Sequence, residues 1–343
     1  MTVTIDADPE VSAAPARATV PLLQADDLAR AFPVRRSLGG LLRGEAAPSV
    51  RALNGVSLSI ARGETLAVVG ESGCGKSTLA RALVRLIELD EGQIDFSGTD
   101  VRALRGAALR QYNRRVQLVF QDPYGSLNPR MRVREILGEA LAVHRIVPPT
   151  ARPGRIAELL SLVRLPLDAG GRLPHQFSGG QRQRIAIARA LAVEPELLVA
   201  DEIVSSLDVS VQAQILNLLL ELQQRLGLAI LLVSHDLRVV RHLAHRVAVM
   251  YLGKVVEIGP ADAVFDAPAH PYTQALLLAA PKLVPGGRSR EAAIRGELPS
   301  PLAIPAGCPF HPRCPRAIDL CRTTPPPEVS LPQGQRALCH LAG

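Results

Sequence analysis

The segment "GESGCGKST", residues 70–78, constrains the fold more than any other part of the chain. It follows a continuous apolar run from Leu66 to Val69 and opens "KSTLARALVRLIEL" (76–89), whose apolar residues have helical spacing. A buried strand, a glycine-rich turn and a helix, in that order, are typical of a parallel sheet covered by helices. Such a turn directs backbone N–H groups at phosphate oxygens beside the positive end of the helix.

The same segment fits the nucleotide-binding pattern G-x-x-x-x-G-K-S/T. Lys76 is placed to neutralise the β- and γ-phosphates, and Ser77 to offer its hydroxyl to Mg²⁺. The segment therefore predicts a nucleoside triphosphate site. Its predicted binding residues are Gly70, Glu71, Ser72, Gly73, Cys74, Gly75, Lys76, Ser77 and Thr78.

A second apolar run, "LLVADE" (197–202), ends in two acidic residues. A buried strand that ends in a paired acid is expected at a ligand site. Asp201 is predicted to hold Mg²⁺ through water, and Glu202 to polarise an attacking water as general base.

The rest of the chain alternates between strand and helix patterns. "VSLSIARG" (56–63) predicts an antiparallel strand with a turn, "EGQIDFSG" (91–98) a hairpin, and "AILLVS" (229–234) a buried strand. Helical patterns from about 125 to 177 interrupt this alternation and indicate an inserted subdomain. After about 259 the periodicity fades, apart from a helix that begins near Pro271.

Composition excludes several classes of protein. The net charge is +7, but the arginines are scattered, which favours a solvated surface over a nucleic-acid-binding patch. The first twenty residues lack the apolar core of a signal peptide, and no run of about 18 apolar residues exists to span a bilayer. We therefore expect a soluble, cytosolic protein with no nucleic acid partner.

Together with residues 70–78 and 201–202, "FSGGQRQR" (177–184) gives the chain a specific resemblance to the ATP-binding-cassette (ABC) ATPases, whose signature is commonly LSGGQ. Phe32 resembles the aromatic residue that stacks on adenine. Gln121 resembles the Q-loop glutamine, "SSLD" (205–208) the D-loop and His235 the switch histidine. The resemblance covers about residues 21–343. Phe177, Ile203 and Ser206 depart from the commonest family residues, but none of them removes a functional group.

The resemblance implies an α/β fold: a P-loop (RecA-like) parallel sheet core, an antiparallel β subdomain, an inserted α-helical subdomain and a C-terminal extension rich in cysteine. The expected boundaries are a flexible arm at 1–20, an ATPase domain at 21–258 with its helical part at about 122–180, and the extension at 259–343.

The resemblance also implies a composite ATP site, because two cassettes of this family close head to tail. The signature of one cassette would bind the γ-phosphate held by the other, so a second ABC ATPase subunit, a paralogue or another copy, is an expected partner. Glu202, His235 and Gln121 would be catalytic, and Gln121 would also contact Mg²⁺. The further ATP-binding residues would be Ser178, Gly179, Gly180, Gln181 and Asp208.

Three segments resemble the oligopeptide/dipeptide importer ATPases: "FQDPYGSLNPRM" (120–131), "HPYTQALLLAAP" (270–281) and "GELPSP…GCPFHPRCP" (296–315). Related members handle nickel or other small solutes. The implied partners are two transmembrane permease subunits and, indirectly, an extracytoplasmic solute-binding protein. The chain would lie at the cytoplasmic face of the inner membrane as a peripheral subunit.

Four of the five cysteines lie near the C-terminus with spacing C-x5-C-x6-C-x17-C. Disulfides are disfavoured in the cytosol, and clustered thiolates repel one another unless a metal compensates them. The leading prediction is a four-iron–four-sulfur (4Fe–4S) cluster; Zn²⁺ and unligated thiols are the alternatives. The predicted ligands are Cys308, Cys314, Cys321 and Cys339.

Two other classes compete with an importer ATPase. A non-transport cassette that acts on ribosomes or DNA usually has two cassettes or a long coiled coil, whereas the segment between Gln121 and Ser178 is too short for one. A degenerate cassette that binds ATP without hydrolysing it is disfavoured by the presence of Glu202 and His235.

Overall fold

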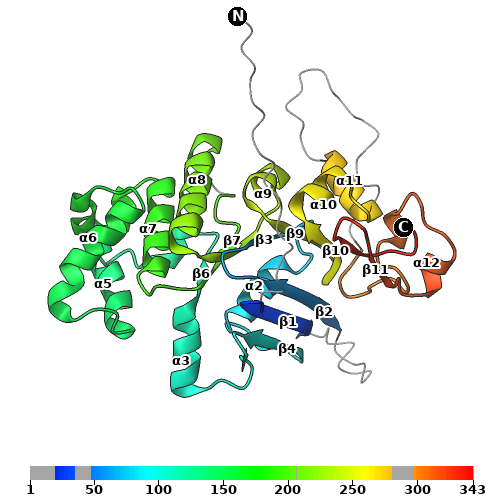
Figure 1. Cartoon of the computed structure of the whole chain (residues 1–343), viewed down its shortest axis with the longest axis horizontal. Helices are drawn as coiled ribbons and strands as arrows, with labels where there is room; N and C mark the ends of the chain where they lie inside the picture. The colour runs from blue at the N-terminus through cyan, green and yellow to red at the C-terminus, as the bar shows by residue number, and fades with distance from the viewer. Residues whose placement is uncertain (1–19, 35–47, 206, 280–296, 298, 343) are drawn as a thin grey trace, which may run out of the picture.

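The computed structural model describes residues 20–34, 48–205, 207–279, 297 and 299–342. The predicted N-terminal arm therefore lies outside the described residues except for Val20. Strands and helices alternate through the centre of the chain, and the expected α/β class is confirmed (Figure 1).

An eight-stranded sheet forms the centre, with the strand order β11-β12-β10-β9-β3-β8-β7-β6. The pairs β9–β3, β3–β8, β8–β7 and β7–β6 are parallel, and β10 and β12 add antiparallel strands at one side. The strands are β3 (Thr65–Val69), β6 (Val116–Val119), β7 (Leu197–Asp201), β8 (Ala229–Val233), β9 (Arg246–Tyr251), β10 (Lys254–Pro260), β11 (Glu328–Ser330) and β12 (Arg336–Leu338).

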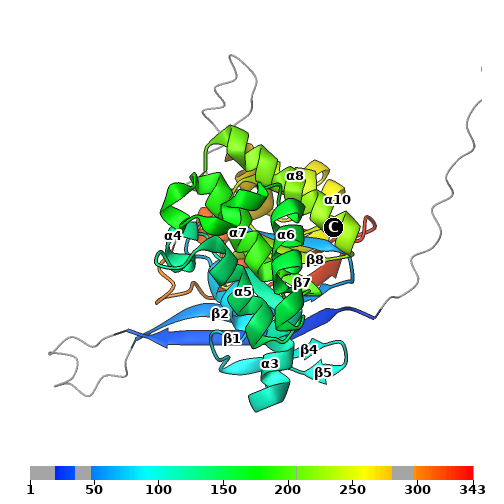
Figure 2. The ribbon, with the colours of Figure 1, turned by 90° about the vertical axis from the view of Figure 1, so that its left-hand side faces the viewer.

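A smaller antiparallel sheet has the order β2-β1-β4-β5. It contains β1 (Leu23–Pro33), β2 (Ser49–Ile60), β4 (Glu91–Phe96) and β5 (Thr99–Asp100). The predicted hairpin at 91–98 is confirmed by β4 and β5, and the predicted turn at 62–63 leads from β2 into β3. Figure 2 shows this sheet as a separate layer beneath the central one.

The central sheet buries both of its faces, as its continuous apolar runs predicted. Ala67 and Val69 of β3 point into one hydrophobic core with the helical segment, while Leu66 and Val68 point into a second core with the antiparallel sheet. Strands β3 and β6 to β10 each contribute residues to both cores.

Eleven α-helices and four 3-10 turns complete the described residues. The helices are α2 (Lys76–Leu83), α3 (Gly106–Arg115), α4 (Pro123–Ser126), α5 (Val133–Val143), α6 (Arg152–Leu162), α7 (Gly179–Leu191), α8 (Val209–Leu226), α9 (Leu237–Leu243), α10 (Ala261–Asp266), α11 (Pro271–Ala279) and α12 (Leu320–Thr323). The turns are η1 (Pro149–Ala151), η2 (Leu167–Gly171), η3 (Pro174–Gln176) and η4 (His311–Arg313).

The C-terminal extension is more ordered than its sequence predicts. β12 pairs with β10, so the extension adds two strands to the edge of the central sheet. In Figure 1 the extension and the helices α5 and α6 lie at opposite ends of the long axis. The carboxyl ends of the parallel strands, where the sequence predicts the site, lie between them.

Candidate nucleotide-binding site

The glycine-rich loop joins β3 to α2, as predicted. Gly70 has a φ of +150°, and a Cβ there would lie 2.2 Å from the carbonyl oxygen of Met250. Gly75 has a φ of +107°, and its Cβ would lie 2.2 Å from the carbonyl oxygen of Ala52. Only glycine fits at both positions, because a side chain would clash with backbone that cannot move aside.

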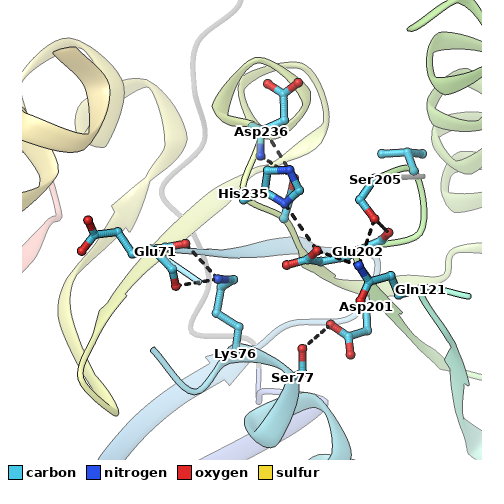
Figure 3. Close-up of polar contacts among 12 residues, drawn as sticks. Glu71, Lys76, Ser77, Gln121, Asp201, Glu202, Ser205, His235 and Asp236 are labelled. Atoms are coloured by element: carbon cyan, nitrogen blue, oxygen red, sulfur yellow. Dashed lines mark hydrogen bonds and ion pairs between the residues drawn. The ribbon is translucent and has the colours of Figure 1, made fainter. Parts of the chain in front are cut away.

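Lys76 lies across this loop. Its side chain is buried, and its Nζ donates to the carbonyl oxygens of Gly70, at 2.8 Å, and Glu71, at 3.0 Å (Figure 3). The ammonium is thereby fixed on the inner side of the loop, where the sequence predicts the β- and γ-phosphates.

The predicted magnesium site is formed by residues of two elements, α2 and β7. The Ser77 hydroxyl, at the start of α2, donates to Asp201 Oδ1 at the end of β7, with 3.0 Å between the oxygens. Burial raises the pKa of Asp201 and the Glu202 charge adds to this, while the Ser77 hydrogen bond opposes it. A hydroxyl and a carboxylate are hard oxygen donors of the kind that Mg²⁺ prefers, so these residues fit that ion.

Glu202 lies beside the predicted magnesium site and contacts the other two predicted catalytic residues. Gln121 Nε2, just after β6, donates to Glu202 Oε2 at 3.2 Å. His235 Nδ1, just after β8, lies 3.4 Å from the same oxygen. Figure 3 shows the three side chains converging from separate strand ends. The φ of +49° at Glu202 is left-handed and rare for a non-glycine residue, and strain of this kind gathers at functional sites.

Gln121 contacts Glu202 and Ser205, whose Oγ lies 3.2 Å from the amide nitrogen. Its predicted contact with Mg²⁺ stays a prediction. Ser205 was identified only as part of the D-loop resemblance; the only sequence signal for its contact with Gln121 is its closeness to Glu202.

The signature residues begin α7. Ser178 caps the helix by accepting from the Gln181 backbone N–H at 3.3 Å, and the Gln181 side chain accepts from the Ser178 N–H at 3.1 Å. Both side chains are exposed, whereas Gly179 and Gly180 face α8 and the residues before it. Among the described residues, Ser178 and Gln181 form hydrogen bonds with each other and within α7 rather than with the phosphate loop.

Two predicted ATP contacts lie in other surroundings. Phe32 is half-buried in β1, with the Arg30 guanidinium carbon 4.9 Å from its ring centroid. Asp208 is exposed at the N-terminus of α8, and Ser206 lies outside the described residues. Their roles toward ATP stay predictions.

The tail cysteines are all free thiols. Burial, with smaller contributions from the charges of the other three tail cysteines, raises the pKa of Cys308 to about 11. Within the described part of the chain, however, no three His, Cys, Asp or Glu side chains are arranged to hold a metal ion. The predicted iron–sulfur cluster and its zinc alternative therefore find no support in this geometry.

No helix in the described ranges is both long and apolar enough to cross a bilayer.

Comparisons with known proteins show the family of the chain. The ABC transporter family model matches residues 53–205, and the model for the C-terminal region of oligopeptide/dipeptide transporters matches residues 256–321. A probable peptide ABC transporter ATP-binding protein, y4tS of Sinorhizobium fredii, is 50% identical, with 93% of this chain and 90% of the relative covered. The di/tripeptide transport ATP-binding protein DppF of Pseudomonas aeruginosa is 48% identical, with 94% and 98% covered.

Solved structures show the same fold. The dimeric ATP-binding cassette MJ0796, in a post-hydrolysis state bound to ADP and Pi, superposes with a TM-score of 0.60 at 27% identity over 70% of this chain and 98% of that one. CbiO1 from Clostridium perfringens, part of the ABC transporter complex cbiONQ, gives 0.61 at 27% identity over 72% and 91%. The chain therefore belongs to the ATP-binding proteins of ABC transporters, within the oligopeptide/dipeptide transporter branch.

Proposed function

We propose that this ABC ATPase hydrolyses ATP to drive the import of di- or oligopeptides or related small solutes through a membrane complex. The convergence of Gln121 and His235 on Glu202, directly beside the Ser77–Asp201 pair, is the observation that carries the proposal. These residues come from four separate segments, and an ATP-hydrolysing site needs all of them in one place.

Each side chain has a distinct role in this mechanism. Lys76 and the loop N–H groups bind the phosphates, while Ser77 and Asp201 would hold Mg²⁺, with Gln121 as a further contact. When bound, Mg²⁺ neutralises charge that develops on the phosphate oxygens. Glu202 orients and deprotonates the attacking water, and His235 hydrogen-bonds the γ-phosphate. Phe32 and Asp208 complete the contacts with ATP.

The site is completed by a second cassette, either another copy or a paralogue. Ser178 and Gln181 are exposed at the start of α7, where the helix dipole favours an anion. Gly179 and Gly180 offer their N–H groups in the first turn of this helix. The dimeric state of the MJ0796 cassette supports this arrangement.

Two transmembrane permease subunits are the proposed membrane partners, at the cytoplasmic face of the inner membrane. A groove of about 380 Å³ lies beside the site, with Leu86, Phe120 and Val143 among its lining residues. These three apolar side chains are exposed, and Phe120 immediately precedes Gln121. We assign the groove to a cytoplasmic helix of a permease, whose binding would then act on Gln121. The solute would reach the permease from an extracytoplasmic binding protein.

Glu202→Gln tests the catalytic assignment. The amide keeps the size of the side chain but cannot accept a proton, so hydrolysis should slow by ~10²–10⁴-fold while ATP still binds. Glu221→Gln is the matched control, because Glu221 is a half-buried residue of α8 that pairs with Arg164 away from the site. Undiminished turnover by Glu202→Gln would remove Glu202 from this role.

The transport assignment has its own test. Affinity purification from membranes should recover two polytopic subunits and a second ATPase, and the purified complex in vesicles should accumulate a labelled dipeptide with ATP. Recovery of ribosomes or DNA would favour the non-transport class.

The tail cysteines carry a separate hypothesis, that of the 4Fe–4S cluster or Zn²⁺. Its support is the spacing C-x5-C-x6-C-x17-C in the sequence, and protein purified without oxygen should then contain close to four irons per chain. Colourless, iron-free protein would leave zinc or unligated thiols.

A further inference from the structure

Glu71, the second residue of the phosphate loop, points its carboxylate away from Lys76, while its backbone carbonyl accepts from the Lys76 ammonium at 3.0 Å (Figure 3). The two ends of this residue therefore face different partners. Whatever holds the carboxylate also helps to hold the carbonyl that positions the lysine.

The carboxylate is held by Arg313 of the C-terminal extension. Arg313 Nη1 lies 2.7 Å from Glu71 Oε2, and Arg313 Nη2 lies 2.9 Å from Glu71 Oε1. The Arg313 side chain is 5% exposed, and that of Glu71 is 25% exposed. A two-bond arginine–carboxylate pair of this kind is among the strongest polar contacts, and removing one partner leaves the other charge buried.

The Glu71 backbone is held from the same side. The hydroxyl of Tyr272, at the start of α11, accepts from the Glu71 N–H at 2.9 Å. The Tyr272 ring lies 4.6 Å from that of Tyr251 and 5.3 Å from that of Phe310, measured between centroids. Since Phe310 lies three residues before Arg313, the aromatic cluster fixes both contacts with Glu71 together.

Arg313 itself ends a short turn that the extension holds at several points. Its N–H donates to the Phe310 carbonyl at 3.0 Å, and the Cys308 N–H donates to the Cys321 carbonyl at 2.8 Å. Gly307 allows this approach, because its φ is +67° and a Cβ there would lie 2.4 Å from the Cys321 carbonyl oxygen. The segment "CPFHPRCP" thus presents the guanidinium to the loop in a fixed position.

We infer that Arg313 is a positioning residue for ATP binding: it fixes Glu71, and through Glu71 the geometry of the phosphate loop and of Lys76. The C-terminal extension therefore contributes to ATP affinity although none of the predicted ATP contacts lies in it. This inference rests on the proposed function only in that the loop binds ATP.

The experiment compares Mg·ATP binding and hydrolysis by the full-length chain and its variants. Arg313→Ala should weaken ATP binding about 10-fold and raise KM by a similar factor with a smaller change in kcat, since the loop and not the reacting groups is disturbed. Arg313→Lys should restore part of the affinity. Arg336→Ala is the control, because Arg336 lies in the same extension and forms an exposed pair with Glu328 at 3.0 Å; its ATP affinity should equal that of the wild type.

A double-mutant cycle separates the ion pair from general loss of structure. Arg313→Ala combined with Glu71→Ala should weaken ATP binding no more than the worse single variant, because both remove one contact. Should Arg313→Ala not fold, Arg313→Lys and Glu71→Gln provide the same comparison.

The opposite results overturn the inference. If Arg313→Ala had a lower melting temperature but unchanged ATP affinity at a temperature where it is folded, Arg313 would have a structural role only. If the effects of the two substitutions on ATP affinity were additive, the Arg313–Glu71 pair would be excluded as the cause of the weaker binding. A wild-type chain that binds no ATP would overturn the proposed function as well, whereas normal wild-type binding with unchanged Arg313→Ala affinity would overturn the inference alone.

Discussion

Two glycine-rich segments begin helices in this protein, and they differ in the side-chain hydrogen bonds that hold them: the first receives such bonds from residues distant in the chain, and the second from its own residues. The phosphate loop before α2 is contacted from the extension by Tyr272 and Arg313, and its Lys76 is buried. The signature segment before α7 is capped by its own Ser178 and Gln181, which are exposed. Both offer N–H groups to an anion, yet the first is assembled within one chain and the second presents an open face. The difference indicates a site completed by another cassette.

The largest effects on ATP hydrolysis should come from variants that disable one of these two segments and leave the other intact. Ser178→Arg places a bulky cation where the partner's γ-phosphate is expected, so hydrolysis should fall by ~10²–10³-fold while ATP affinity of the separate chain stays at the wild-type value. Lys76→Ala should abolish both binding and hydrolysis, because the loop loses its charge. Equilibrium binding of a fluorescent ATP analogue and phosphate release measure the two quantities.

Mixing the two variants tests whether the site is shared. A mixed dimer has one site that combines an intact Lys76 with an intact Ser178, so some hydrolysis should return on mixing. If Ser178→Arg instead weakened ATP binding by the separate chain, the signature would act within its own chain and the comparison would fail.

Most of the sheet core could be predicted because its signals are local. The apolar runs before residues 70 and 201 predicted β3 and β7. Ser77 and Asp201 were each predicted to bind Mg²⁺, and they lie 3.0 Å apart. The contacts of Glu71 with Tyr272 and Arg313 could not be predicted, since they join residues 201 and 242 positions apart.

Two further features, the strands of the extension and the packing of Gly180, also have weak signals in the sequence. β11 and β12 contain three residues each, so they are too short for an alternating strand pattern to be recognised in the sequence. Gly180 was predicted only as a phosphate contact. The structure shows a second reason for glycine there, because a Cβ would lie 2.3 Å from Val211 Cγ1 on α8.

Gly180→Ala therefore tests a packing role within the signature. Val211 is β-branched and stiff in a helix, so the added methyl should lower the free energy of unfolding by about 1 to 3 kcal/mol. Val211→Ala should recover much of this loss in the double variant. Gly154→Ala is the control, since a Cβ at that helical position meets no atom within 4 Å. Urea unfolding measures all four proteins, and wild-type stability for Gly180→Ala would show that the two helices can separate without cost.

The smallest expected effect is on the pH dependence of folding stability, through a residue that helps to hold the phosphate loop. His270 is buried, and this burial lowers its pKa to about 4, against a weaker opposing hydrogen bond with the Leu338 backbone. Its neutral Nδ1 accepts from the Tyr272 N–H at 3.0 Å, which fixes the start of α11 and hence the hydroxyl that Glu71 contacts. Protonation of His270 would remove that acceptor.

The direction of the pH effect follows from where the proton binds. The unfolded chain takes up the proton near pH 6.5 and the folded chain only near pH 4, so the stability contributed by neutral His270 is complete above pH 6.5 and is lost as the pH falls toward 4. Between pH 7 and pH 6 the loss should be about 0.7 kcal/mol, and His270→Gln should remove that part of the pH dependence. The exposed His242, replaced by Gln, should leave the slope unchanged. Equal slopes for wild type and His270→Gln would mean that His270 protonates without disturbing α11, and that Tyr272 does not depend on it to reach the phosphate loop.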